Sequence, residues 1–519
     1  MTTEEIYLHI FKKMADHRMQ FDQELDDTAL YFYPSAPSFF FTTKRDNQKK
    51  LYDATGRLAA GIYANMLFGY LTNPAIKWIE LEFINNELNT NAAAISWLKK
   101  LEQQIHTSLM LSNFNTAIGE FYHDFVCFGT GIVFVEEDDV FGLRFYNVPL
   151  AESYIEENSK EEIDRVYRKM RLTGFKLKEM FGDKLPSEVL ETIEKDPVKE
   201  HYLLHIVEPR EVFDPSKADA LNMPFKSIKG LLGDTNDKLR ILSESGYRRF
   251  PFFVPRHTKM SWTPYGTSPC REELPNMKSL NELVKSYVLN SARECDPPLD
   301  MPAKGYYSVL NKTPGAINYR RPNLGKEETI RRLLPEPKFS PAETMIENFR
   351  QQIKSSLYND LFMVLVQLPR MTATEVIERS QEKMVLLGQV IGRLKNELFD
   401  KIIDYMAQRM IELGRVEPPP DFIQQQGYEI KLTSLLAKAQ KFSEIRNVQN
   451  FFVSLAQLAQ YSPQSLDVIN FDKIVEELVD LAGLPNNVLR TSDEIEQIRQ
   501  ARLAVMAAQQ AMQQQGQQQ

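Results

Sequence analysis

The sequence has few cysteines and lacks a long apolar segment. Its three cysteines, Cys127, Cys270 and Cys295, are scattered and odd in number, so we expect reduced thiols rather than a disulfide framework or a metal site. No stretch approaches the roughly 18 apolar residues of a membrane-spanning helix, and the run LFMVLV at 361–366 has only six. The N-terminal segment carries charges throughout, which argues against a signal peptide. We therefore expect a cytoplasmic setting and no membrane partner.

The sequence also lacks the motifs of common enzymes. No phosphate-binding loop of the form GxxxxGK[ST] is present, and the run Gly129–Gly131 precedes a strand pattern instead of opening a helix. His201 and His205 lie in a strand-like segment without a third ligand, which favours a structural role over zinc binding. The acidic run Glu136–Asp139 is interpreted as a solvated turn, because one turn supplies too few oxygen ligands for a hard cation. We therefore predict that the protein is not an enzyme and has no cofactor.

The composition is that of a globular protein with more than one domain. The 519 residues are 43% hydrophobic and 25% charged, which excludes a disordered chain. The formal net charge is −8, so the surface as a whole is not a nucleic-acid-binding surface.

The N-terminal half has the pattern of an α+β fold. Residues 1–110 are mostly helical in pattern, with an apolar stripe of Ile62, Met66, Leu67 and Tyr70 that ends before Asn73–Pro74. The stretch 126–148 is rich in β-branched and aromatic residues and predicts a hairpin. Further strands are expected at 163–171, 201–208 and 247–261.

Two helices with a small basic segment between them are predicted in the middle of the chain. The first follows Pro275 and ends at Asp296, where two prolines follow. The second begins at Ser340, where Pro341 and Glu343 complete a capping-box pattern with proline at the first helical position. Residues 299–339 are rich in turns and carry eight basic and four acidic residues.

A long helix is predicted over 373–413. Thr372 and Glu375 form a capping box, and Gly414 ends the apolar periodicity. At about 1.5 Å per residue this helix would span roughly 60 Å, with a bend expected at Gly388 or Gly392. Such a length indicates a strut in a large assembly.

Several stretches, in the right order along most of the chain, resemble motifs of one known family. This family comprises the portal proteins, or head-to-tail connectors, of short-tailed, podovirus-type bacteriophages. Two positions depart from the usual motif residues: Ala54 replaces a small polar residue and Ile79 replaces a phenylalanine. The stretches are LYDATGRLAA (51–60), LTNPAIKWIEL (71–81), SNFNTAIGEFYHDFVCFGTGIVFVEED (112–138), SWTPYGTSP (261–269), KTPGAINY (312–319), PRMTATEVIERSQE (369–382) and GLPNNVLRTSDEIEQIRQAR (483–502).

The resemblance implies an α+β, predominantly helical portal fold that assembles as a ring, usually of twelve subunits, around an axial channel for double-stranded DNA. It implies the following parts: a wing (1–265), a first stem helix (266–296), a clip (297–339), a second stem helix (340–360), a tunnel loop (361–372), a long wing helix with a proline-rich exit (373–430), a crown (431–500) and a glutamine-rich tail (501–519).

The resemblance also implies functional residues and partners. Lys354 of the second stem helix, with Gln367 and Arg370 of the tunnel loop, would approach the DNA backbone, although Arg370 could instead pair with Glu375 or Glu378. The basic clip would dock the large terminase subunit and later the tail adaptor, through Arg320, Arg321, Arg331 and Arg332. Major capsid and scaffold proteins would be further partners at one vertex of the virion. Two alternatives are another virion structural protein, such as a scaffold or internal core protein, and a DNA-processing motor subunit.

Overall fold

The structure is a computed structural model, and it describes most of the first 432 residues. The described residues are 2–40, 51–300 apart from 86, 139–141, 215, 218 and 234–236, the short pieces 310–311, 317, 319 and 331–332, then 340–360, and 387–432 apart from 421–422 and 424–426.

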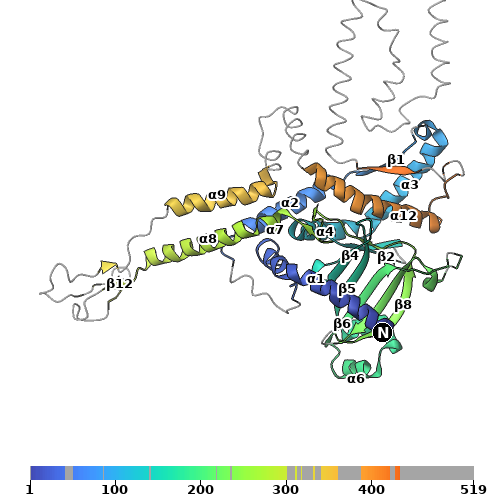
Figure 1. The fold of residues 1–519 in the computed structure, drawn as a ribbon. Coiled ribbons are helices and arrows are strands. Elements are labelled where there is room, and N and C mark those ends of the chain that lie inside the picture. Colours follow the sequence, from blue (N-terminus) through green and yellow to red (C-terminus); the bar gives the residue numbers. More distant parts are fainter. Residues whose placement is uncertain are drawn as a thin grey trace, which may run out of the picture. The chain divides into compact units, whose positions relative to one another are not determined.

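The fold mixes long helices with antiparallel sheets, as the sequence predicted (Figure 1). The helices are α1 (Thr3–Phe32), α2 (Thr55–Leu71), α3 (Ala92–Leu111), α4 (Phe114–Phe128), α5 (Gly174–Phe181), α6 (Ser187–Lys195), α7 (Pro269–Glu272), α8 (Leu274–Cys295), α9 (Ser340–Ser356) and α12 (Asp400–Glu412). The strands are β1 (Ile79–Phe83), β2 (Val133–Asp138), β3 (Gly142–Asn147), β4 (Ser153–Glu157), β5 (Ile163–Thr173), β6 (Glu200–Pro209), β7 (Phe225–Leu232), β8 (Leu239–Tyr247), β9 (Phe252–Phe253), β10 (Thr258–Lys259), β11 (Gly266–Thr267), β12 (Leu299–Asp300), β13 (Arg331–Arg332) and β14 (Tyr428–Leu432).

The largest sheet has five antiparallel strands in the order β4-β5-β6-β7-β8. Alternate side chains of a strand point to opposite faces, and both faces of this sheet are covered. On β6, Leu204 joins an apolar cluster with Tyr7 and Phe11 of α1, whereas its neighbour Leu203 joins a cluster with Leu177 of α5. Helix α1 therefore covers one face, and α5 covers part of the other.

A smaller sheet, β3-β2-β9, lies beside α4. The predicted hairpin is present in β2 and β3, but its first residues, 126–128, belong to α4. Gly129 ends α4 with a φ of +77°, a conformation that favours glycine, and a side chain there would collide with the backbone of Thr267. The strands predicted over 247–261 form only in part: the region holds Tyr247, the last residue of β8, and the two-residue strands β9 and β10. Prolines at 251 and 255 explain this, because proline cannot donate to a strand ladder.

The buried face of α2 differs from the predicted stripe. Ile62 is exposed, and the buried positions are Gly56, Ala59, Ala60, Tyr63, Ala64, Leu67 and Leu71. Helices α4 and α9 pack against α2, and the small side chains Gly56, Ala59, Ala60 and Ala64 on this face allow the helices to approach closely.

The long helix is described from residue 387 to its end. Residues 387–394 are α-helical, the next turn, Lys395–Phe399, is π-helical, and α12 completes the helix. Gly414 follows with a φ of +67°, which confirms the predicted stop. The irregularity within the described part of this helix is the π turn, whereas a bend had been expected at Gly388 or Gly392.

Candidate functional site: the α8–α9 helix pair and its base

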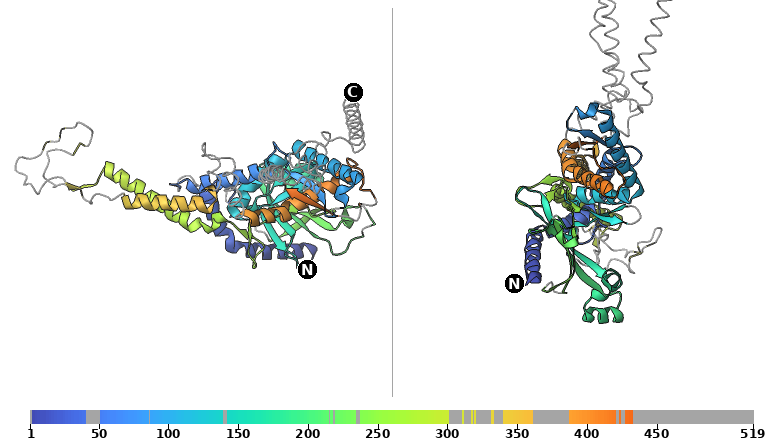
Figure 2. Two further views of the ribbon diagram at one scale, coloured as in Figure 1. Left: turned by 90° about the horizontal axis from the view of Figure 1, so that it is seen from above. Right: turned by 90° about the vertical axis from the view of Figure 1, so that its right-hand side faces the viewer.

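Helices α8 and α9 form an antiparallel pair that extends away from the five-stranded sheet (Figures 1 and 2). Two hydrogen bonds fix the antiparallel register. Near the base, the Ser356 hydroxyl donates to the Glu273 carboxylate at 2.7 Å. Farther out, the Tyr287 hydroxyl donates to the Glu343 carboxylate at 2.6 Å. The predicted helix after Pro275 and the predicted helix beginning at Ser340 are both confirmed.

The burial of the pair changes along its length. Close to the base, the apolar side chains of both helices are buried: Met277, Leu280, Val284, Ile353 and Leu357. Farther out, Ile346 is still buried, but Val288 and Leu289 are each 48% exposed and Met345 is 50% exposed. A pair of helices with apolar side chains exposed at its far half has surface that another protein surface can cover.

Ion pairs fix the base of the pair to the helices beneath it. Arg350 of α9 donates through Nε (3.1 Å) and an Nη nitrogen (2.8 Å) to the buried carboxylate of Asp53, which precedes α2. Burial alone would raise the pKa of Asp53, but hydrogen bonds from Thr55 and Arg350 outweigh it, and the net pKa is lowered. Lys278 of α8 pairs with Asp27 of α1 at 2.6 Å. Both helices of the pair are therefore tied to the N-terminal helices.

The end of α9 is held by a second set of contacts. Tyr358 adopts a φ of +58° just after α9, and its ring lies 5.2 Å from the ring of Tyr63 on α2. The Tyr63 hydroxyl lies 3.0 Å from Nε2 of His257, and burial lowers the pKa of His257 to about 4. The side-chain amide of Asn359, oriented to satisfy its neighbours, donates to the carbonyl of Ala59 on α2 at 3.1 Å.

Most of the predicted site residues lie outside the described part of the chain. This applies to Gln367, Arg370, Arg320 and Arg321. The backbones of Arg331 and Arg332 form strand β13, which pairs antiparallel with β12. Lys354 lies in the last turn of α9 and is half-buried. The expectation of DNA contact and of docking at these residues therefore stays a prediction.

The residues that anchor the helix pair were not found by sequence reasoning. Asp53 lies within the motif LYDATGRLAA (51–60), and the local sequence gives Arg350 no distinguishing feature. Their pairing joins positions 297 residues apart, and no local pattern marks it. Such a contact becomes visible only once α2 and α9 have packed.

The structure also bears on the predictions for the histidines, the cysteines and membrane-spanning helices. His205 is buried, its Nε2 lies 3.0 Å from the Ser227 hydroxyl, and burial lowers its pKa to about 3, so a structural role is confirmed. Cys127, Cys270 and Cys295 are free thiols. Among the described residues, no group of histidine, cysteine or carboxylate side chains has the arrangement of a metal site, and no helix is long and apolar enough to cross a membrane.

Comparisons with known proteins agree with the motifs. Residues 5–489 match the family described as "Bacteriophage head to tail connecting protein". The chain is 29% identical to the probable portal protein of Bordetella phage BPP-1, over 98% of this chain and 93% of that protein. It is 25% identical to the portal protein of Salmonella phage epsilon15, with the same two coverages of 98% and 93%. The chain therefore belongs to the bacteriophage head-to-tail connecting protein family.

Proposed function

We propose that this protein is a phage portal: a ring around an axial channel through which double-stranded DNA enters the capsid and later leaves it. The observation that carries the proposal is the family match, which spans 5–489 and therefore most of the chain. The names of the two relatives are those of portal proteins, and both alignments cover nearly the whole of this chain. A structural role in the virion, rather than catalysis, follows from this membership.

The α8–α9 pair is the proposed stem. Val288, Leu289 and Met345 of its far half are about half exposed in the single chain, and neighbouring copies in a ring, which we expect to number twelve, would cover them. The intervening residues 297–339 would form the clip, and residues 361–372 the tunnel loop. The long helix and the sheets would form the wing, and residues 431–500 the crown.

The charge of the protein suits a channel that must let DNA slide. Each phosphate that a lysine or arginine neutralises adds a salt-sensitive attraction, and many such contacts would hold the duplex in place. A chain with a net charge of −8 and few channel-facing cations would guide DNA without binding it tightly. We assign this guiding contact to Lys354, Gln367 and Arg370.

The clip is the proposed docking platform. Its basic residues would bind the large terminase subunit during packaging and the tail adaptor afterwards, and contacts with major capsid and scaffold proteins would place the ring at one capsid vertex. The segment lacks the sequence pattern of a recognition helix for the major groove, so it would bind proteins rather than read DNA sequence.

Native mass spectrometry and negative-stain imaging of the purified full chain test the proposal. We expect closed rings of one subunit number with a central hole. Monomers with ATPase activity would instead support a motor subunit. A monomer or an open polymer at micromolar concentration and moderate salt would support a scaffold or internal core protein.

A further inference from the structure

The two faces of the long helix make chemically different contacts. One face is apolar, and its side chains Ile402, Ile403, Met406 and Met410 are buried. On the same side, the ring of Phe399 packs against Trp78, with 5.4 Å between ring centroids. This face rests on α3 and on the residues around β1. Charge screening by salt does not weaken such contacts.

The opposite face is charged, and its residues pair with partners outside the helix. Glu397, Lys401, Asp404 and Glu412 recur at helical spacing, so they share one face. The pairs are Glu397 with Arg256 at 2.9 Å, Lys401 with Glu162 at 3.5 Å, Asp404 with Arg249, Arg409 with Glu137 at 2.7 Å, and Glu412 with Arg248 at 3.2 Å. Ionic contacts therefore hold this side of the helix.

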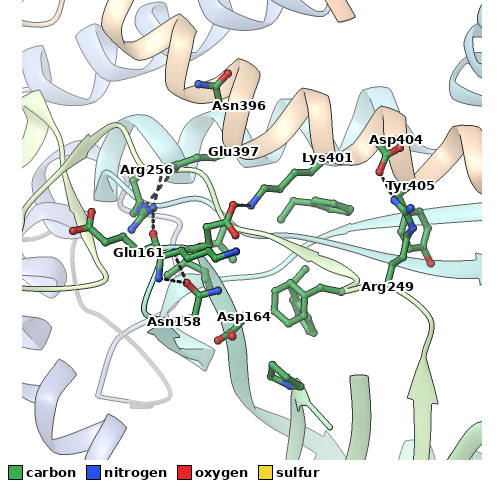
Figure 3. A pocket seen from close by; sticks show the side chains of 18 of the residues that line it. Asn158, Glu161, Asp164, Arg249, Arg256, Asn396, Glu397, Lys401, Asp404 and Tyr405 are labelled. Atoms are coloured by element: carbon green, nitrogen blue, oxygen red, sulfur yellow. Dashed lines mark hydrogen bonds and ion pairs between the residues drawn. The ribbon is translucent and has the colours of Figure 1, made fainter. Parts of the chain in front are cut away.

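Three of these pairs cross a cavity of about 620 Å³ (Figure 3). Figure 3 shows Glu397, Lys401 and Asp404 pointing from the helix toward the strands and turn on the other side. Phe250, Phe252 and Phe253 line part of the cavity, together with charged side chains from both sides. A cavity of this size with polar walls has room for water, so the contact across it is not a packed apolar core.

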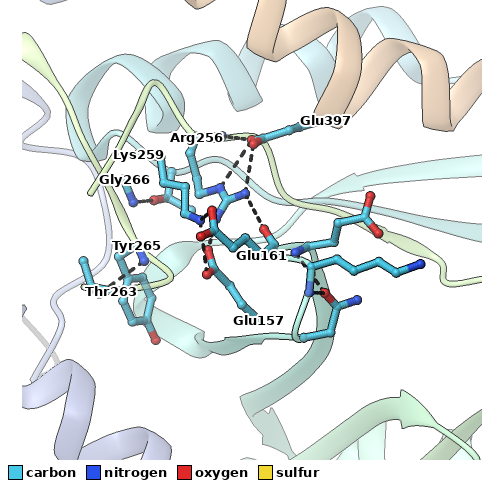
Figure 4. Close-up of polar contacts among 12 residues, drawn as sticks. Glu157, Glu161, Arg256, Lys259, Thr263, Tyr265, Gly266 and Glu397 are labelled. Carbon is cyan, nitrogen blue, oxygen red and sulfur yellow. Dashed lines mark hydrogen bonds and ion pairs between the residues drawn. The ribbon is translucent and has the colours of Figure 1, made fainter. Parts of the chain in front are cut away.

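Arg256 is the centre of the contact (Figure 4). Its side chain is 4% exposed, and its guanidinium donates to Glu397 at 2.9 Å, to the carbonyl of Glu161 at 3.2 Å, and to Glu157. Lys259 adds pairs with Glu157 at 3.4 Å and with Glu161. We call these five residues the Arg256 cluster. The cluster joins the long helix to the turn between β4 and β5.

Three backbone irregularities meet at this cluster. Glu397 lies within the π-helical turn Lys395–Phe399. The pairing of β4 with β5 shifts register between Glu156 and Glu157, and Glu161 has a φ of +62°. Each is less stable than regular structure and persists where tertiary contacts enforce it. Arg256 bonds to residues of all three segments.

The same sheet is attached very differently on its α1 side. There, Arg18 donates to the carbonyls of Leu150 (3.0 Å), Ala151 (2.8 Å) and Ser153 (3.0 Å), next to the apolar cluster of α1 with β4–β8. A loss of the Arg256 cluster would therefore leave the sheet attached to α1.

We propose that the Arg256 cluster is a salt-sensitive latch between the long helix and the β4–β5 turn. When it opens, residues 157–163 move away from the charged side of the π turn 395–399, while the apolar face of the helix, which includes Phe399, stays packed. Added salt screens the exposed pair of Lys401 with Glu162 first, and water entering through the cavity then hydrates the charges of the cluster. The π turn connects residues 387–394 to α12, so the cluster acts at the junction between these two parts of the helix.

Hydrogen–deuterium exchange of the full chain tests this inference at low and at high sodium chloride concentration. In the wild type, we expect salt to raise exchange in peptides covering 157–163 and 395–401, with little change in peptides covering 402–410 and β6. The variant Glu397→Gln should raise exchange in the same two peptides at low salt by about tenfold or more, because it weakens a hydrogen bond to a charged group. Glu412→Gln is the matched control, since Glu412 lies on the same helix face and pairs outside the cluster.

Three results would overturn the latch. The first is exchange that responds to neither salt nor Glu397→Gln. The second is an equal rise in 402–410 and in the two latch peptides, which would mean that the helix unfolds as a whole. The third is an equal rise in the exchange of peptides 157–163 and 395–401 in the variant Glu412→Gln. If Glu397→Gln fails to fold, the exchange of the wild type at low and high sodium chloride concentration tests the latch by itself. None of these readouts depends on ring formation, so this inference can fail while the proposed function stands.

Discussion

Arg256 and Glu397 are 141 residues apart in the sequence, yet the backbone N–H of Arg256 and its guanidinium donate to the same carboxylate, at 2.8 Å and 2.9 Å. The carboxylate therefore satisfies a backbone donor and a buried charge at once, and its removal leaves both without this acceptor. This pair fixes the long helix over the β4–β5 turn, just as Arg350 and Asp53 fix α9 over α2. Long-range charged pairs thus help to position both the long helix and α9.

The first prediction concerns the base of the helix pair. Arg350→Ala leaves the buried carboxylate of Asp53 with fewer donors and should lower the free energy of unfolding by about 1–3 kcal/mol. The lowered pKa of Asp53 means that its contribution is present above the pKa of the unfolded state and is lost as pH falls through the folded-state pKa. Urea unfolding at neutral and at acid pH measures both effects. Lys354→Ala, in the same helix, is the control and should change stability little.

The second prediction concerns Asp124, which is buried in α4 and accepts a hydrogen bond from the Asn147 amide at 2.8 Å. Burial raises the pKa of Asp124 to about 7, so the folded state holds this proton more tightly than the unfolded state. Its ionisation should therefore destabilise the fold progressively as pH rises from about 4 to about 7, by up to about 1.4 kcal/mol per pH unit. Asp124→Asn should remove this dependence and stabilise the protein at pH 8. Urea unfolding at pH 5 and pH 8 measures it, and a wild type whose stability is independent of Asp124 ionisation would contradict it.

The third prediction concerns the exposed apolar residues of the helix pair. Leu289→Asp and Met345→Asp should leave the subunit folded, because both side chains are about half exposed, but should weaken the ring by placing charge in the proposed subunit contact. Native mass spectrometry would detect smaller species at subunit concentrations where the wild type forms rings. Val198→Asp places the same charge on an exposed apolar residue beside α6 and is the control. Rings that resist both substitutions would remove the far half of the pair from the subunit interface.

The fourth prediction concerns the clip. Reversal of Arg320, Arg321, Arg331 and Arg332 to glutamate should leave rings intact and abolish binding of the packaging motor, because the proposed docking is electrostatic. Pull-down of the large terminase subunit by wild-type and variant rings measures this. Undiminished docking after all four reversals would reject the clip assignment or its electrostatic basis.

The fifth prediction concerns Arg370. Arg370→Ala should spare ring assembly but change the amount of DNA retained after packaging, with a weaker dependence on salt than the wild type, because one phosphate contact per subunit is lost. Packaged DNA is measured after nuclease treatment at several salt concentrations. Identical salt dependence in the two proteins would favour the alternative, in which Arg370 pairs with Glu375 or Glu378.

Much of the local structure followed from the sequence, because local rules govern it. The helix after Pro275, the helix from Ser340 and the stop at Gly414 are set by capping residues, proline and glycine within a few positions of the boundary. The strands near 163–171 and 201–208 followed from β-branched and aromatic content. The family also followed from the sequence, since ordered motifs survive where overall identity is low.

Only the tertiary structure decided which residues hold these elements together. Ile62 fits a helical stripe as well as Tyr63 does, and the packing of α4 and α9 selects the face that is buried. The charges of Arg18, Arg256 and Arg350 look like solvated surface charges in the sequence, yet each meets carboxylates or carbonyls brought into place by the fold. The π turn at 395–399 likewise has no local signal. The apolar periodicity of helices and strands, the helix caps and the turns are encoded by neighbouring residues. The partner of a buried charge instead depends on segments that meet only when the chain has folded.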